Sequence, residues 1–202
     1  MRHVLLDQFR VVFYVLGDHE PYSSSWDNAW ETLGKFGKAN RSERNAVGEF
    51  VFMYQREYRI SDSHITVLGC TLFSNAPSSK RRHLNDFREI DGWTVEEHCQ
   101  LHKQDLAWLN SRVNAMSVDS ERKIVIFTHY SPTEDIRAVE PCYAQSDIKS
   151  DFQTDWRNED CWKSPNIKVW RSATGKRLYT NQKGYWQEHS PGFREGIVVH
   201  VD

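Results

Sequence analysis

The sequence has no long apolar run and no excess of charge of one sign. No apolar segment approaches the length needed to span a bilayer, so a transmembrane helix is not expected. The apolar stretch at the start is broken by Asp7, Gln8 and Arg10, whereas a signal peptide needs a longer one. Lys and Arg total 26 against 28 Asp and Glu, for a net charge of -2, which gives no field that attracts nucleic acid or an anionic membrane. We therefore expect a cytoplasmic protein with no nucleic-acid or membrane partner.

Cysteine is also scarce, and its spacing is wide. The four residues Cys70, Cys99, Cys142 and Cys161 form no Cys-x-x-Cys pair, which argues against a zinc ribbon or a redox motif. We expect them to be ordinary thiols of a reducing compartment.

Aromatic residues, by contrast, are plentiful, with 8 Trp, 8 Tyr and 10 Phe among 202 residues. Because each aromatic side chain buries a large area, a chain of this length can form a real core, and intrinsic disorder is not expected. We expect a single domain that spans residues 1–202.

Segments with strand-like and helix-like patterns alternate along the chain. Helices are predicted from Trp26, which follows three serines, and from Val95, which follows a capping box formed by Thr94 and Glu97. Apolar runs predict strands over residues 11–16, 65–69 with 71–73, and 123–128, and later candidates at 167–170, 177–180 and 196–201. This alternation favours an α/β fold, in which the chemistry lies at the carboxyl ends of strands.

The helix that starts at Val95 carries a predicted apolar stripe and a competing candidate site. The stripe comprises Val95, Cys99, His102, Leu106, Leu109 and Val113. His98, His102 and Asp105 have a spacing that places three metal donors on one helix face. Because His102 also belongs to the apolar stripe, we favour a hydrogen-bonded core histidine over a metal site.

Two predicted strands are followed at once by groups capable of chemistry. Gly17 closes the first strand and is followed by Asp18, an oxygen ligand, and His19, a nitrogen ligand or proton donor. His129 follows the strand that ends at Thr128.

The segments around these strand ends resemble the calcineurin-like metallophosphoesterases, and in particular a branch common in fungal proteins. Residues 14–22 are similar to the family's Gly-Asn-His-Glu motif, and residues 125–133 to its Thr-His-His-Ser-Pro motif. The resemblance covers nearly the whole chain from Val11 onward. Further matching segments are residues 66–74, 84–87, 92–96, 175–177 and 180–185.

The resemblance implies a layered α/β sandwich, with sheets flanked by helices, and a two-metal hydrolase that acts on phosphoesters. In the family, the metal pair activates a bridging water and neutralises phosphoryl oxygens. Carried over, Asp18 and His129 are metal ligands, and His19 is the catalytic group that donates a proton or hydrogen bond to the phosphate. The match of both motifs therefore predicts that the strand ends at Gly17 and Thr128 lie side by side, with Asp18 and His129 facing one cleft. The implied cofactors are divalent Mn, Fe or Zn ions.

The sequence departs from the family at both ends. Nothing before Val11 fits the opening Asp-x-His and Gly-Asp-x-x-Asp motifs, because His3 and Asp7 have the wrong spacing. The closing Gly-His-x-His motif is absent after Trp170. Asp18 stands in place of Asn, and Tyr130 in place of His. The sequence thus predicts a domain that is incomplete at the N-terminus.

Two hypotheses follow from these departures. One is a metal-dependent phosphoesterase of altered activity. The other is a non-catalytic pseudoenzyme, or the product of an incomplete gene model, with a binding role at most.

Overall fold

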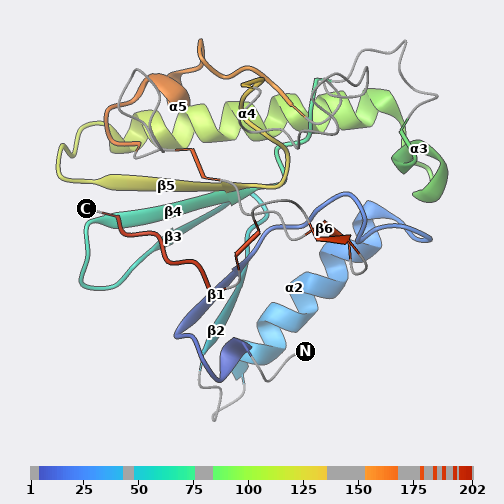
Figure 1. Ribbon diagram of the computed structural model, residues 1–202, viewed down its shortest axis with the longest axis horizontal. Coiled ribbons are helices and arrows are strands. Elements are labelled where there is room, and N and C mark those ends of the chain that lie inside the picture. The colour runs from blue at the N-terminus through green and yellow to red at the C-terminus, as the bar shows by residue number, and fades with distance from the viewer. Residues whose placement is uncertain are drawn as a thin grey trace.

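The computed structural model describes residues 5–42, 48–75, 84–135, 153–167, 178–179, 184–185, 188–189, 193–194 and 196–201. These residues form a mixed α/β structure (Figure 1). In chain order its elements are β1 (Val11–Tyr14), α2 (Trp26–Ser42), β2 (Glu49–Phe52), β3 (Arg56–Arg59), β4 (Ile65–Cys70), α3 (Asp86–Glu89), α4 (Val95–Met116), β5 (Lys123–Thr128), α5 (Asp160–Lys163), β6 (Gly184–Tyr185) and β7 (Glu188–His189).

Two of the three small sheets contain parallel strands joined through a helix. β1 pairs in parallel with β2, and α2 connects them. β4 pairs in parallel with β5 through α4, and it also pairs antiparallel with β3 on its other edge. β6 and β7 form a separate antiparallel pair. Parallel neighbours need such long crossovers, and the predicted alternation of strands and helices reflects them.

β4 is buried on both faces, and this places the two larger sheets in adjacent layers. On one face Leu68 and Cys70 belong to the core cluster that also contains Leu109 and Val113 of α4. On the other face Val67 joins a second cluster between the sheets, which includes Val51 and Met53. Because successive strand residues point to opposite faces, β4 separates α4 from the β1–β2 sheet.

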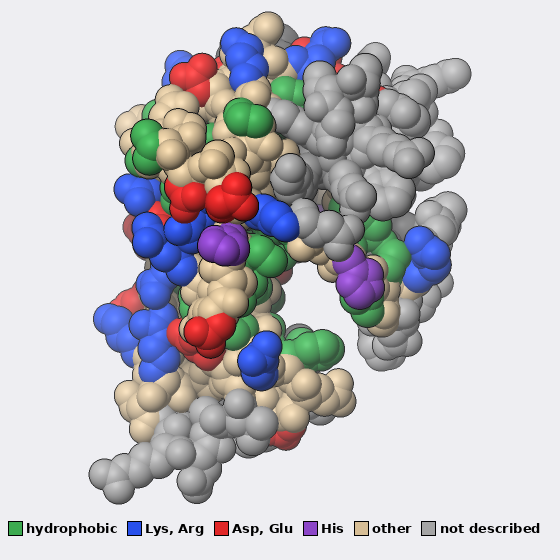
Figure 2. All heavy atoms as spheres, turned by 90° about the vertical axis from the view of Figure 1, so that its left-hand side faces the viewer, with side chains coloured by type: hydrophobic (Ala, Val, Ile, Leu, Met, Phe, Trp, Pro, Cys, Tyr) green, Lys and Arg blue, Asp and Glu red, His purple; other side chains and the backbone are tan. Residues whose placement is uncertain are grey.

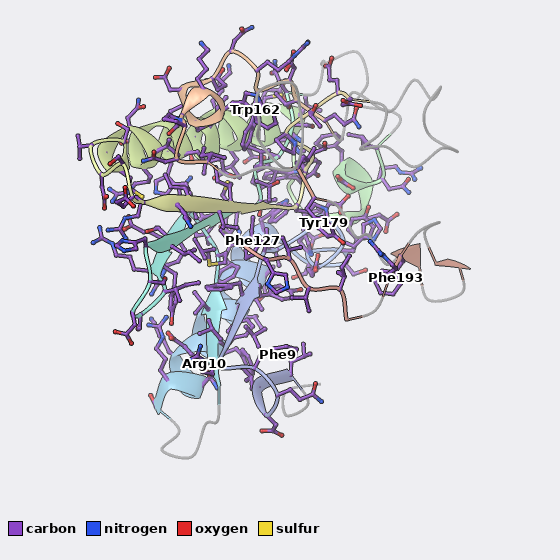
Figure 3. All side chains as sticks on the ribbon, turned by 60° about the vertical axis from the view of Figure 1, so that its left-hand side comes forward. Phe9, Arg10, Phe127, Trp162, Tyr179 and Phe193 are labelled. Carbon is purple, nitrogen blue, oxygen red and sulfur yellow. The ribbon has the colours of Figure 1, made fainter. Side chains whose placement is uncertain are left out.

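Helix α2 covers the other face of the β1–β2 sheet. The Phe36 and Phe50 rings lie 4.7 Å apart in an edge-on contact, and the Asn40 side-chain oxygen accepts a hydrogen bond from the Phe50 N–H at 2.8 Å. The described elements therefore follow one another as helix α4, the β3–β4–β5 sheet, the β1–β2 sheet and helix α2 (Figure 1). Phe127 lies on the side of β5 that faces β1, with its ring 5.8 Å from that of Phe13 (Figure 3).

Both predicted helix starts are confirmed. Thr94 and Glu97 form the expected capping box, in which the Thr94 hydroxyl accepts from the Glu97 N–H at 3.2 Å and the Glu97 carboxylate accepts from the Thr94 N–H at 3.0 Å. At the start of α2, the Ser25 hydroxyl oxygen accepts from the Asn28 N–H at 3.2 Å. Each side chain satisfies a helix N–H that has no partner inside the helix.

Several predicted strands are shorter than expected or wrong. β1 ends at Tyr14 rather than Leu16, and residues 71–73 form an irregular turn. Residues 196–201 form no strand, because they lie in solvent, with Val198 and Val199 71% and 47% exposed. Of the candidate at 167–170 only Ile167 is described, and it makes a single parallel bridge to Ile124 of β5. The candidate at 177–180 lies mostly outside the described residues, and positions 178–179 form no strand.

The face of the molecule shown in Figure 2 carries Lys and Arg side chains with Asp and Glu among them. Oppositely charged side chains of the described residues pair with each other: Glu57 accepts from both Arg59 and Arg112, and Asp119 pairs with Arg122 at 3.1 Å. No helix within the described ranges is long and apolar enough to cross a membrane. Cys70, Cys99 and Cys161 are reduced thiols, and Cys142 lies outside the described residues.

Candidate functional site

The ends of β1 and β5 meet, and they bring together two of the residues singled out in the sequence. His129 Nε2 lies 2.9 Å from Asp18 Oδ1, although the two residues are 111 positions apart in the chain. The contact combines a hydrogen bond with an ion pair when the imidazole is protonated. The expected meeting of the two strand ends is therefore present in the structure.

The turn that carries Asp18 is closed by Glu20. Its carboxylate accepts from the Gly17 N–H at 3.1 Å through Oε2 and from the Tyr14 hydroxyl at 2.7 Å through Oε1. Gly17 lies so close to the histidine that a Cβ at this position would be 2.7 Å from His129 Cε1. Glu20 belongs to the motif quoted above, but nothing in its spacing showed that it closes the turn.

Asp18 lies between two imidazoles. Its Oδ2 is 3.9 Å from His19 Nε2, and its side chain is 10% exposed, against 51% for His19 and 39% for His129. Burial acts to raise the Asp18 pKa, but the hydrogen bond and charge of His129, together with the charge of His19, outweigh it and hold this pKa below its usual range. The site thus presents a buried, ionised carboxylate flanked by two imidazoles that a ligand from solvent can reach.

A second carboxylate, Asp86, belongs to this site and was not singled out from the sequence. It accepts hydrogen bonds from the Tyr22 hydroxyl at 2.7 Å and from the Tyr130 hydroxyl at 3.4 Å. The ring of Tyr22 in turn lies 4.7 Å from that of His19. Burial, followed by the nearby charge of Asp18, raises the Asp86 pKa above its ordinary value. The only sequence signal for Asp86 was its place in the matching segment 84–87.

Thr71, directly after β4, ties the two strand ends to each other. Its carbonyl oxygen accepts from the N–H groups of His129 and Tyr130 at 3.3 and 3.2 Å. Its hydroxyl donates to the Leu16 carbonyl at 2.9 Å. A single residue that directly follows β4 therefore fixes the backbone on both sides of the contact between Asp18 and His129.

His98, His102 and Asp105 lie on one face of α4, but they bind backbone rather than facing an ion site. All three are buried, and their polar atoms contact residues 72–74. The predicted stripe is only partly right: Leu106 is half-buried and packs against the core, Cys99 is half-buried, and the stripe missed His98 and Asp105, which are 0% and 2% exposed. The preference for His102 as a hydrogen-bonded core residue is confirmed.

The candidate metal donors that meet at the strand ends are two side chains, Asp18 and His129. Asp18 and His129 supply a carboxylate and an imidazole, a combination suited to Mn, Fe or Zn. In the described part of the chain, no group of three or more His, Cys, Asp or Glu side chains is arranged to hold a metal. Of the two residues near the start whose spacing does not fit the family's opening motifs, Asp7 is exposed, and His3 lies outside the described residues.

Comparison with known proteins gives one relative of unknown role. The uncharacterized protein L509 of Acanthamoeba polyphaga mimivirus is 23% identical over 218 residues, which cover 95% of this chain and 74% of the relative. No protein-family model matches the chain, and no solved structure matches it. The alignment is longer than the 202 residues of this chain, so the relative carries residues that are absent here.

Replacing Gly17 with alanine is expected to separate His129 from Asp18. The new Cβ would lie 2.7 Å from His129 Cε1 and 2.8 Å from its Nδ1, and the partly exposed ring has room to move away. Because the ring moves rather than the backbone, we expect a loss of stability of only about 1 kcal/mol. Histidine side-chain NMR and a crystal structure of the variant measure the separation.

The matched control is Gly37→Ala, since a Cβ there would meet Phe50 Cδ1 at an ordinary 3.6 Å. A Gly17→Ala protein that keeps the 2.9 Å contact between His129 and Asp18 would contradict the prediction.

Proposed function

We propose that this chain is a metallophosphoesterase-type domain that keeps one half of the family's metal centre and uses it to bind phosphoesters. The observation that carries the proposal is the 2.9 Å contact between His129 and Asp18. These are the two residues that the resemblance assigns as metal ligands, and they come from strand ends far apart in the sequence. A chance match of two short motifs would not require them to meet.

The arrangement of layers supports the same proposal. Two adjacent sheets lie between α4 and α2, and the candidate site lies at the ends of strands from both sheets. This agrees with the layered sandwich that the resemblance implies. In folds of this general kind, ligands bind at the carboxyl ends of strands.

The chain's own residues divide the binding task between them. Asp18 and His129 would hold one divalent cation, which when bound supplies positive charge for the phosphoryl oxygens. His19, whose side chain is 51% exposed, can donate a hydrogen bond to a phosphoryl oxygen from the other side of Asp18. Glu20 and Thr71 hold the two strand ends in place.

Of the two hypotheses from the sequence, the geometry favours binding without fast hydrolysis. A two-metal centre needs a carboxylate shared between the ions and several further ligands. Asp18 stands at the position that the resemblance assigns to a ligand of one ion. Of its neighbouring carboxylates within the described residues, Glu20 accepts from Gly17 and Tyr14, and Asp86 accepts from two tyrosine hydroxyls. The donors at this site therefore do not supply the shared carboxylate.

We expect the purified chain with Mn²⁺ to hydrolyse an aryl phosphate or a phosphodiester no faster than the His19→Ala, His129→Ala double variant. Elemental analysis and titration calorimetry should show at most one ion per chain, and Asp18→Ala should abolish its binding. Glu31→Gln, which removes an exposed carboxylate on α2, is the matched control and should keep the ion.

Two other results would each overturn part of the proposal. A wild-type chain that binds no divalent ion would remove the assigned role of Asp18 and His129. Robust turnover that is lost in the double variant, with close to two ions per chain, would establish the enzyme hypothesis instead. The additional ligands would then be sought among the residues outside the described ranges.

The genomic DNA distinguishes a protein that truly lacks the family's motifs from an incomplete gene model. The decisive segments are the DNA upstream of Met1 and the DNA between the codons for Trp170 and Arg171. An in-frame Gly-His-x-His sequence at the second place would restore the closing motif. The corresponding part of the mimivirus relative provides an independent check, because that protein carries residues that this chain lacks.

A further inference from the structure

The turn that follows β4 has a backbone conformation that needs support. Leu72 and Phe73 have φ angles of 77° and 49°, in the left-handed region that residues other than glycine rarely adopt. Both residues are buried, at 0% and 1% exposure, so the turn does not relax into solvent. Conformations of this kind persist only where the surroundings hold them, and they gather at functional sites.

Three side chains of α4 supply that support. Asp105 Oδ2 accepts from the Leu72 N–H at 2.7 Å, and His102 Nδ1 lies 2.9 Å from the Leu72 carbonyl oxygen, to which it donates. His98 Nε2 accepts from the Ser74 N–H at 3.0 Å. Their spacing of four and then three residues places them on one helix face, so a single rigid element holds the whole turn.

This polar group interrupts a face that is otherwise apolar. Farther along α4 the same face continues with Leu109 and Val113, both completely buried. Burying three polar side chains is unfavourable unless each is hydrogen-bonded, and apolar residues would pack α4 equally well. Their presence therefore points to a need for this particular turn rather than for the helix contact alone.

The turn is joined directly to the candidate site. Thr71, its first residue, accepts from the N–H groups of His129 and Tyr130 and donates to the Leu16 carbonyl. Leu16 lies two positions before Asp18. A shift of the turn would thus be passed to both partners of the contact between Asp18 and His129.

We propose that Asp105, together with His102 and His98, is a positioning residue that sets the distance between Asp18 and His129 through the turn at residues 71–74. None of the three contacts Asp18 or His129 directly, although the His98 ring lies 5.5 Å from that of Tyr130. Mn²⁺ affinity as a measure of this effect rests on the proposed function, whereas the hydrogen exchange of backbone amides does not.

The test compares two substitutions of Asp105 in the full chain. Asp105→Leu removes both hydrogen-bond acceptors, and we expect the amides of Leu72, His129 and Tyr130 to exchange roughly tenfold to a hundredfold faster, relative to amides within β4. Mn²⁺ affinity should fall by a factor of about ten to a hundred, as it does when residues that orient metal ligands are lost. Asp105→Asn keeps one side-chain oxygen as the acceptor for the Leu72 N–H. Its new amide donor can face Gln55, because the Gln55 amide can turn its oxygen toward it. This variant should therefore show the wild-type exchange rates and the wild-type Mn²⁺ affinity.

Val113→Ala is the matched control, because it weakens the packing of the same helix without touching the turn. It should leave the relative exchange of the three amides and the Mn²⁺ affinity unchanged. If Asp105→Leu does not fold, His102→Leu removes only the donor to the Leu72 carbonyl and should show the same pattern.

Three results would overturn the inference: unchanged amide protection in Asp105→Leu, failure of Asp105→Asn to restore it, or an equal loss of Mn²⁺ affinity in Val113→Ala. If the wild-type chain binds no Mn²⁺, the proposed function fails and the exchange data alone decide whether α4 positions the strand ends.

Discussion

Adding a methyl group at Gly69 is expected to lower the free energy of unfolding by about 3 kcal/mol. Gly69 lies in β4 on the face toward the β1–β2 sheet, and a Cβ at this position would be 2.6 Å from Met53 Cβ and 2.8 Å from Met53 Cε. Ordinary contacts between carbon atoms are about 3.5–4.0 Å. Because Met53 Cβ is fixed by its own backbone, Gly69→Ala has to push the two sheets apart. Denaturant unfolding followed by circular dichroism measures the loss.

Gly34→Ala is the matched control for this prediction. Gly34 lies within α2, and a Cβ there would meet nothing within 4 Å. Alanine at a helix interior position of this kind is expected to stabilise the protein by about 0.5–1 kcal/mol. Equal stability of the Gly69→Ala variant and the wild type would show that the sheets are not packed as closely as described.

The second large effect is expected for Asp105→Asn, which should change how the free energy of unfolding depends on pH. Burial raises the pKa of Asp105 to about 6, although hydrogen bonds from Gln55, Leu72 and Cys70 act in the opposite direction. The unfolded chain releases this proton near pH 4, so the folded state holds more protons between pH 4 and pH 6. Stability from this group is therefore lost as the pH rises through that window, by about 3 kcal/mol.

His98 acts in the opposite direction over nearly the same range. Burial, followed by the charge of His102, lowers the pKa of His98 to about 4, whereas the unfolded chain takes up this proton near pH 6.5. Stability from His98 is therefore lost as the pH falls through this window, by about 3 kcal/mol. In the wild type the two contributions largely cancel.

Asp105→Asn removes the Asp105 contribution and leaves that of His98. Relative to the wild type, the variant should lose about 3 kcal/mol of stability between pH 6.5 and pH 4. Urea unfolding at half-unit pH intervals measures the difference, with Asp62→Asn as the control for loss of one carboxylate at an exposed position. Parallel pH curves for Asp105→Asn and the wild type would show that Asp105 is not held in the buried environment described.

The elements predicted well from the sequence are those with strong local signals. The capping box at Thr94 located the start of α4, and the apolar run at residues 123–128 matched β5. The meeting of Asp18 and His129 was also expected, because the two segments that carry them resemble two motifs of one family and both follow predicted strands. Here local pattern and tertiary structure agree.

The parts that could not be predicted depend on contacts between distant segments. The predicted apolar stripe of α4 did not include His98 and Asp105, yet both are almost fully buried, since they bind the backbone of residues 72–74. Residues 71–73 look like a strand by composition, but the left-handed conformations of Leu72 and Phe73 follow from those bonds. Asp86 joins the site only through Tyr22 and Tyr130.

The position of Thr71 also determines when the site is assembled during folding. It joins a segment near residue 16 to one near residue 129, so the first 75 residues contain β1 to β4 but lack the second partner. A chain emerging from the ribosome can pair the early strands, but it cannot complete the site until β5 is added beside β4. Contacts over such separations form slowly. The contact between Asp18 and His129 should therefore form only after β5 has joined β4, and its presence marks a chain in which these two strands are already paired.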